Sequence, residues 1–440
     1  MIEINLRQTQ VEKYHSAARL IFCSAAAFFI FSLGCPADVI SMIAPWSPWR
    51  QPMLRQSPEI KEEMAGEAVF REDEFAARSR KFPEIKLSTD QSFGRSETTD
   101  GFLSGFMLEV PLFNKTKNFL SAQISKFERE GYQIHRRELT RKRISRFLRT
   151  YYEARRLAGE LAMLDEKIKI FENLIGRESQ LVQEKMKFPG ELDSFYRERL
   201  KTKRAIAHAQ VQIESLRALM IYMAGANSGE TMNLEPLDDA TIIPVPDHQF
   251  ERWKQKSLEN QPGLLAAKLR IKTQQAKAAM ARRDWMPEIS AFSSYSHDPR
   301  FLGNENQIFS GIRVKWNIWD FGAGRHEARK EAATLKKMDA QLKNQESRFK
   351  LRVEKVIAEY RAAYGLWEES KNYSQFQKTF SKKQEELFEA GKISLKQMML
   401  SRIQWLNQQI VHQEAIEEVL KRQIELTQTL GTFVPAGAGQ

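Results

Sequence analysis

Cysteine is almost absent from this chain of 440 residues, and glycine and proline are sparse. The two cysteines, Cys23 and Cys35, are too few for a disulfide framework or a cysteine-based metal site. The 21 glycines and 15 prolines gather at a few points, which leaves long stretches without a helix breaker. The composition, 42% hydrophobic and 28% charged, excludes a polytopic helical membrane protein.

One apolar run stands out, and it lies near the N-terminus. Leu20–Gly34 is an uncharged run of fifteen residues that follows the basic residues Lys13 and Arg19. This run fits a signal-peptide core and is short for a spanning helix, which needs about twenty residues. A membrane anchor or a buried helix is the alternative. We therefore expect residues 1–36 to be a signal peptide and the remaining chain to be exported.

Cys35 follows Ser-Leu-Gly, an imperfect match to a lipoprotein cleavage box. Lipidation of Cys35 and cleavage a few residues later, near Ala37, both remain open.

Several chemistries find no support in the sequence. The net charge is +12, but basic residues are interleaved with acidic ones in stretches such as 136–138 and 327–331, as on solvated helix faces. We expect no nucleic-acid partner.

The seven histidines have no partner at ligand spacing, and His297-Asp298 is expected in a surface turn between strands. Gly322-x-Gly324 lacks the third glycine of a nucleotide loop, which favours a tight strand-to-helix exit. We expect neither an enzyme nor a cofactor or metal site.

The chain is an internal duplication. Pro58 and Pro83 are 25 residues apart, as are Pro262 and Pro287, and the two pairs are offset by 204. The segment 110–113 matches 316–319 at an offset of 206, and Gly190 matches Gly391 at 201. Matches in the same order at a nearly constant offset indicate two copies of one structural unit.

Each unit predicts the same order of elements. A helix starts at the first proline, and a strand pair follows near 84–93 and 106–112 in the first unit, and near 288–297 and 308–318 in the second. Residues 308–318 alternate apolar with polar or basic side chains, which predicts a strand between two environments. The first hairpin is less clearly patterned.

A very long helix comes next in each unit, near 115–185 in the first. Its apolar residues repeat as in a coiled coil, at Leu157, Leu161, Leu164, Ile168, Phe171 and Ile175, and in the second unit at Leu335, Leu342, Phe349, Val356 and Ala363, with Val353, Tyr360 and Trp367 on a parallel stripe. A turn follows, and a second helix returns near 192–223 and 395–430.

These patterns divide the chain into five parts. They are the signal peptide 1–36, a first repeat 37–225, a polar linker 226–249, a second repeat 250–432 and a tail 433–440. Each repeat contains a helix, a β-hairpin and a long helical hairpin.

Strands of about ten residues with one apolar face suit a tilted membrane barrel, and a barrel must close. Four strands are too few to close, since about eight is the practical minimum. We therefore expect the chain to associate with copies of itself.

The same residues resemble the TolC-type outer-membrane efflux family, also called outer membrane factors. The resemblance rests on the helix stop Trp285–Ile289, the strand exit Trp319–Arg325 and the turn Phe388–Ser394. It implies a homotrimer in the outer membrane, with a 12-stranded barrel in the lipid and a helical periplasmic tunnel. It also implies a periplasmic adaptor and an inner-membrane transporter as partners.

The resemblance also implies roles for particular residues. The helix tips that face the adaptor are expected at Lys187, Phe188, Pro189, Gly190 and Glu191, and at Glu389, Ala390, Gly391, Lys392, Ile393 and Ser394. Lys86, Arg313 and Lys315 are expected to line the barrel lumen, either favouring anions or simply solvated. Trp285, Trp316 and Trp319 are expected at the membrane interface, as anchors or as packing at the junction between barrel and helices.

The resulting hypothesis is an exit duct of a tripartite efflux or type I secretion system. A secreted coiled-coil scaffold without a pore is the alternative. Small molecules, metal ions and proteins are equally consistent as cargo, because the inner-membrane partner selects it.

Overall fold

The computed structural model describes residues 57–80, 82, 84–92, 101–112, 115–184, 190–225, 234–242, 244–245, 247–297 and 306–430. All of them belong to one compact unit, Trp49–Thr432. The expected signal peptide at 1–36, with Cys35, and the expected tail at 433–440 lie outside the described residues.

The helices begin and end where the sequence places its breakers. The helices α3 (Pro58–Ser79) and α7 (Pro262–Ala281) carry proline in the first turn, where its missing N–H costs no hydrogen bond. The longest helices are α4 (Lys115–Gln183) and α8 (Ala323–Glu389), with 69 and 67 residues. They are followed by the return helices α5 (Gly190–Ala224) and α9 (Leu395–Leu430). At 1.5 Å per residue, α4 and α8 each extend about 100 Å.

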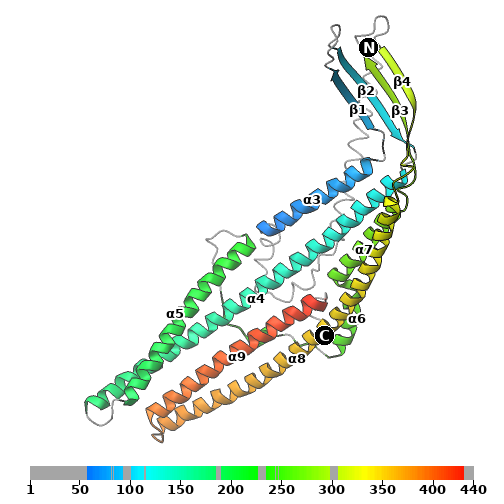
Figure 1. The fold of residues 1–440 in the computed structure, drawn as a ribbon. Helices are drawn as coiled ribbons and strands as arrows, with labels where there is room; N and C mark the ends of the chain where they lie inside the picture. The colour runs from blue at the N-terminus through cyan, green and yellow to red at the C-terminus, as the bar shows by residue number, and fades with distance from the viewer. Residues whose placement is uncertain are drawn as a thin grey trace, which may run out of the picture. The chain divides into compact units, whose positions relative to one another are not determined.

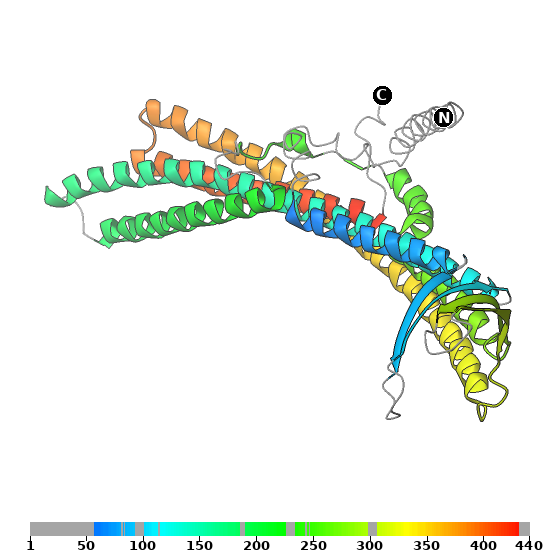
Figure 2. The same ribbon diagram turned by 90° about the horizontal axis from the view of Figure 1, so that it is seen from above.

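These helices pack as a row. Helices α3 and α5 lie end to end along one flank of α4 (Figures 1 and 2), and α7 and α9 also pack on α4. Helix α8 follows, in contact with α7 and α9. The predicted coiled-coil seams are buried or partly buried, and the buried members are Leu157, Leu164, Phe171, Ile175, Phe349, Val353, Val356, Tyr360, Ala363 and Trp367. Since burying such a side chain contributes about 1.5–3 kcal/mol, these seams hold the row together.

The two predicted hairpins form one four-stranded antiparallel sheet in the order β1-β2-β3-β4. Its strands are β1 (Glu84–Ser92), β2 (Gly101–Pro111), β3 (Glu288–His297) and β4 (Asn306–Lys315). Strand β4 ends at Lys315, three residues before the predicted end at 318. Strands β2 and β3 pair from Ser104↔His297 to Pro111↔Ser290, which joins the two repeats.

The linker and the start of the second repeat contain structure that the sequence pattern did not predict. Residues Asp239–Thr241 form the short 3₁₀ helix η3, and Asp247–Asn260 form helix α6. Helix α6 therefore starts three residues before the expected start of the second repeat at 250. Phe250 and Trp253 of α6 are buried, and the Phe250 ring lies 6.1 Å from that of Tyr360 on α8.

Candidate duct: sheet, junction, helix tips and strap

The sheet has one polar and one apolar face, because paired residues of antiparallel strands point the same way. The pairs Lys86↔Met107, Ser290↔Arg313 and Glu288↔Lys315 lie on one face, so the three expected lumen residues share it. The other face is apolar, and several of its side chains are exposed in the single chain, among them Ile85, Ile308, Ile312 and Val314 at 58–74%.

The polar face carries acids as well as bases. The Arg313 guanidinium lies 3.5 Å from the Glu109 carboxylate and 4.8 Å from the centre of the Phe292 ring. The Ser290 hydroxyl donates to the same carboxylate at 2.7 Å. Glu84, which pairs with Glu109, and Glu288 lie on this face too. The mixture agrees better with a solvated polar lining than with a purely cationic one.

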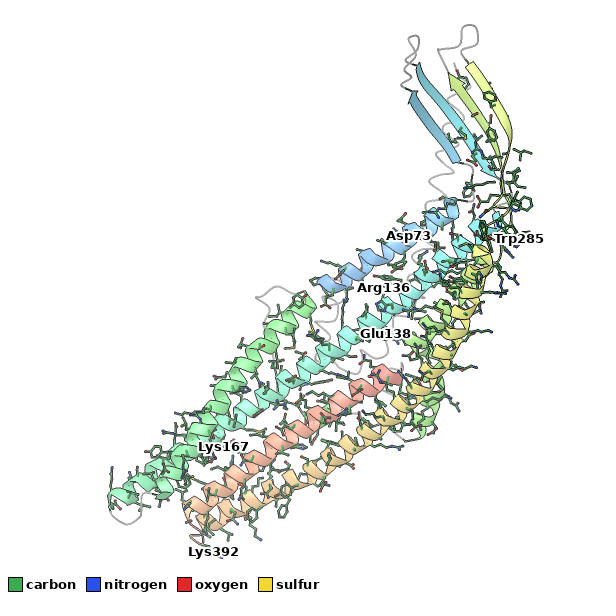
Figure 3. The ribbon with its side chains drawn as sticks, in the orientation of Figure 1. Asp73, Arg136, Glu138, Lys167, Trp285 and Lys392 are labelled. Atoms are coloured by element: carbon green, nitrogen blue, oxygen red, sulfur yellow. The ribbon has the colours of Figure 1, made fainter. Side chains whose placement is uncertain are left out.

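Exposed aromatic residues gather between the sheet and the helices. Trp285 (labelled in Figure 3), Trp316 and Trp319 are 52–74% exposed. The Trp316 indole N–H donates to the Trp285 carbonyl at 3.0 Å, which ties the end of β4 to the turn before β3. Sequence reasoning missed Phe321, which is 91% exposed and has a φ of +52°.

The turn after Trp319 is held by a carboxylate. Asp320 accepts from the backbone N–H groups of Gly322 at 2.9 Å and Gly324 at 2.7 Å. These two donors lower the pKa of Asp320 below its usual range. Gly322, at φ +86°, is the N-cap of α8, so this segment is a tight exit from strand to helix.

The second helix tip is well formed. The N–H of Gly391, at φ +69°, donates to the Phe388 carbonyl, and the N–H of Lys392 donates to that of Leu387. These bonds close α8. Ser394 and Gln397 then form a reciprocal cap at the start of α9, at 3.1 and 3.3 Å. Lys392 is exposed at this end (Figure 3).

The first tip differs from the second. Lys187, Phe188 and Pro189 lie outside the described residues, and Gly190 is the first residue of α5. Gly190 does not have a positive φ, so it is not the conformational equivalent of Gly391.

A strap, defined here as residues 234–242 and 244–245, crosses α4, α8 and α9. The Arg155 guanidinium on α4 donates to the carbonyls of Glu235 at 2.8 Å and Pro236 at 2.9 Å. The Gln413 amide on α9 makes two hydrogen bonds with the backbone of Leu237. Sequence reasoning treated this segment only as a polar linker, because its partners are remote in sequence.

Asp239 is the centre of the strap. Its carboxylate accepts from the Trp367 indole at 2.8 Å and contacts the His412 ring at 3.1 Å and the Lys371 ammonium at 3.7 Å. Burial lowers the pKa of His412, and Asp239 partly opposes this shift. The other histidine considered above, His297, is the last residue of β3 rather than part of a turn.

Within the described residues, no helix is long and apolar enough to cross a membrane.

The row of paired long helices with a small antiparallel sheet is a fold that solved structures also have. Three solved structures share this fold: VceC of Vibrio cholerae, CmeC of Campylobacter jejuni and MtrE of Neisseria gonorrhoeae in its open state. Their TM-scores are 0.71, 0.72 and 0.74, at 12%, 12% and 11% identity. The alignments cover 89%, 89% and 88% of this chain, and 97%, 87% and 89% of those chains. A search of curated protein sequences finds no match.

A second comparison concerns the second repeat. Residues 253–432 match the family described as outer membrane efflux protein, so the resemblance predicted from the sequence is confirmed over the second repeat.

Proposed function

We propose that three copies of this chain form an exit duct through the periplasm and outer membrane. The main support for the proposal is that both edges of the helix row lack a packing partner. One edge is formed by α3 and α5, and the other by α8. Within the chain, α4 of the first repeat packs on α7 and α9 of the second. The equivalent contact of α8 with α3 and α5 is missing in a single chain. A neighbouring copy supplies it.

Burial at equivalent positions supports this arrangement. Leu164, Phe171 and Leu174 on α4 are 2–5% exposed. The residues 202 positions later, Leu366, Tyr373 and Phe376 on α8, are 48–64% exposed. On the opposing helices, Ile403 of α9 is 7% exposed, and its equivalent 203 positions earlier, Leu200 of α5, is 51% exposed. The surface that α4 and α9 bury against each other within the chain is thus exposed on α8 and α5. Head-to-tail association of copies requires such a pair of complementary open surfaces.

The sheet repeats this relation. Strands β2 and β3 join the repeats within the chain, whereas β1 and β4 are its edges. Pairing β4 of one copy with β1 of the next closes the ring, because an open edge cannot face lipid. Lipid then contacts the apolar face. The polar face, with Lys86, Arg313 and Lys315, lines the lumen. The number three comes from the family resemblance and yields twelve strands.

The helix tips suit contact with partners. The turn 389–394 and its counterpart 187–191 contact a periplasmic adaptor, and the adaptor connects the duct to an inner-membrane transporter that selects the cargo. In this assembly Trp285, Trp316 and Trp319 lie at the level of the membrane interface. The protein needs no cofactor for this role.

Membrane fractionation, heat-dependent gel mobility and single-channel recording test the proposal together. We expect an outer-membrane protein whose unheated form migrates as an oligomer and conducts ions in a planar bilayer. A variant with charges on the open α8 surface, Tyr373→Asp/Phe376→Asp, should remain helical but fail to form the oligomer. Its matched control, Lys336→Asp/Lys337→Asp on exposed positions of α8, should assemble normally. A soluble wild-type protein without conductance would instead indicate a coiled-coil scaffold.

A further inference from the structure

A hollow of about 840 Å³ lies between α3, α4, α7 and α8. This volume is within the range of small-molecule sites, about 300–1,000 Å³. One part of its wall is aromatic and comes from three different helices: Phe70 of α3, Phe127 and Tyr132 of α4, and Phe349 of α8.

The aromatic wall is held in place by specific packing. The rings of Phe70 and Tyr132 stack at 4.7 Å between centroids. The Tyr132 hydroxyl donates to the Glu63 carboxylate at 2.8 Å. Gly66 makes room for this ring, since a Cβ on Gly66 would overlap the Tyr132 hydroxyl. The part of the wall formed by Phe70 and Tyr132 is therefore held in one arrangement.

At Gly131 the backbone of α4 forms part of the wall of the hollow. Gly131 lies inside the 69-residue helix α4, where glycine costs about 1 kcal/mol relative to alanine. No neighbouring atom requires a glycine there, because a Cβ at this position would meet nothing within 4 Å. Gly131 does line the hollow.

The wall of the hollow also contains arginines. Arg270 of α7 and Arg348 and Arg352 of α8 line the hollow, and none of them has a hydrogen bond or ion pair with a described residue. The carboxylates in the lining are engaged: Glu128 lies 3.6 Å from Lys277, and Glu138 (Figure 3) lies 2.7 Å from Lys142.

The arginines on the other flank of α4 differ. Arg129, Arg136 and Arg143 pair with Glu74, Glu67 and Glu59 of α3. Arg270, Arg348 and Arg352, which line the hollow, thus lack the glutamate partners that α3 provides to the arginines of α4.

The hollow and the strap lie on different sides of α4. On α4, Arg155 and Gly159 contact the strap, and His135 lines the hollow. His135 precedes Arg155 by 20 residues, which at 3.6 residues per turn places it about half a turn round the helix. The strap and α6 form an extra layer that would obstruct a lumen. In the proposed duct that layer is outside, and the hollow opens inward.

We propose that this hollow binds organic anions with a flat aromatic body, as a station for cargo in the lumen. The inference rests on the proposed duct only for the cargo role. An aromatic ring stacks on Tyr132 and Phe70, and the carboxylate or sulfonate accepts from the arginines, which are suited to bidentate pairing.

Calorimetric titration of the wild-type protein in lipid nanodiscs tests the ligand class, with 2-naphthoate as the probe. We expect saturable binding of 2-naphthoate and none of the cationic analogue 2-naphthylmethylamine. Arg348→Gln/Arg352→Gln should weaken binding about tenfold or more, because it removes charge-assisted hydrogen bonds. Arg325→Gln/Arg329→Gln removes the same charge from α8 outside the hollow and should leave the affinity unchanged.

A second pair of variants tests the space itself. Gly131→Phe should fill the hollow and abolish binding of 2-naphthoate. Gly131→Ala should leave that binding intact and increase the stability of helix α4. Equal affinity in Gly131→Phe and wild type, or equal binding of the anion and the cation, overturns the site.

Conductance of the same samples separates the two proposals. A conducting channel that does not bind naphthoate rejects this inference alone. Binding without conductance rejects the duct and leaves the ligand site standing.

Discussion

The two repeats place similar apolar residues at equivalent positions and give them opposite environments. Phe171 on α4 is 3% exposed, and Tyr373 on α8, 202 residues later, is 48% exposed. Phe171 belongs to a cluster with Leu174, Phe195 and Ile403, which unites α4, α5 and α9. Tyr373 stacks only along its own helix, on Phe376 at 6.3 Å. The difference shows that burial is set by which neighbours the chain itself supplies.

The largest expected effect comes from truncating the two members of this pair. Phe171→Ala should lower the free energy of unfolding of the chain by about 3–5 kcal/mol, because it leaves a cavity. Tyr373→Ala should leave the fold of the chain intact and weaken the association of copies. Thermal unfolding by circular dichroism measures the first effect, and light scattering after gel filtration measures the second. Equal losses of fold in both variants would contradict the comparison.

The strap lies between the two repeats in the sequence. It contacts α4, α8 and α9 and therefore makes the surroundings of the two repeats different. Asp239→Ala should cost about 1–3 kcal/mol, since it leaves the Trp367 and His412 donors without their acceptor. Asp238→Ala is a matched control on the neighbouring residue, which makes no side-chain cap bond. Urea unfolding of both variants measures the difference, and similar midpoints would show that Asp239 does not hold the strap.

The strap also predicts a pH dependence. The pKa of His412 is lowered in the folded chain, mainly by burial, with Lys371 acting in the same direction and Asp239 opposing. The unfolded state therefore binds more protons below about pH 6.5, and the free energy of unfolding should fall as the pH is lowered from 7. Urea midpoints across this range should decline less in His412→Gln. An identical decline in both proteins would exclude His412 as the group that titrates.

The helix tips provide a smaller contrast. Gly391→Ala should cost about 1–2 kcal/mol, because Gly391 has a left-handed φ of +69°. Gly190→Ala should have little effect, since Gly190 begins a helix and a Cβ there meets nothing within 4 Å. Melting temperatures of the two variants distinguish these outcomes, and a larger loss in Gly190→Ala would reverse the assignment.

The smallest expected effect concerns an ion pair. Arg402 of α9 contacts Glu166 of α4 at 2.7 Å within the chain. The equivalent positions are Arg199 on α5 and Glu368 on α8, which should meet between copies. Glu368→Arg should weaken the oligomer by about 0.2–1 kcal/mol, as for an exposed pair. Adding Arg199→Glu should restore it. Dissociation of the oligomer at increasing temperature measures both, and the absence of rescue would exclude this pairing.

Much of the architecture was predictable because its signals are local in sequence. Proline marks the start of α3 and α7, and the absence of proline along α4 predicts its length. Alternation of side chains predicts β4. The alternation continues through Trp316–Ile318, beyond the last residue of β4 that pairs with β3. Alternation shows to which face each side chain points. Where the strand ends depends instead on where its backbone stops hydrogen-bonding to a neighbouring strand.

The candidate sites were less predictable. The shared face of Lys86, Arg313 and Lys315 follows from strand alternation and register, but the Arg313–Glu109 contact required the pairing of β2 with β3. Helix α6 and the Asp239 contacts with Trp367 and His412 were not foreseen, since these partners are more than a hundred residues away.

The sequence by itself determined the duplication, the long helices and the two hairpins, because periodicity and breakers act over a few residues. The tertiary structure alone decided which of two equivalent surfaces is covered, where the strap crosses and where the arginine-lined hollow opens. Those features depend on which distant segments lie side by side, and no local pattern encodes that.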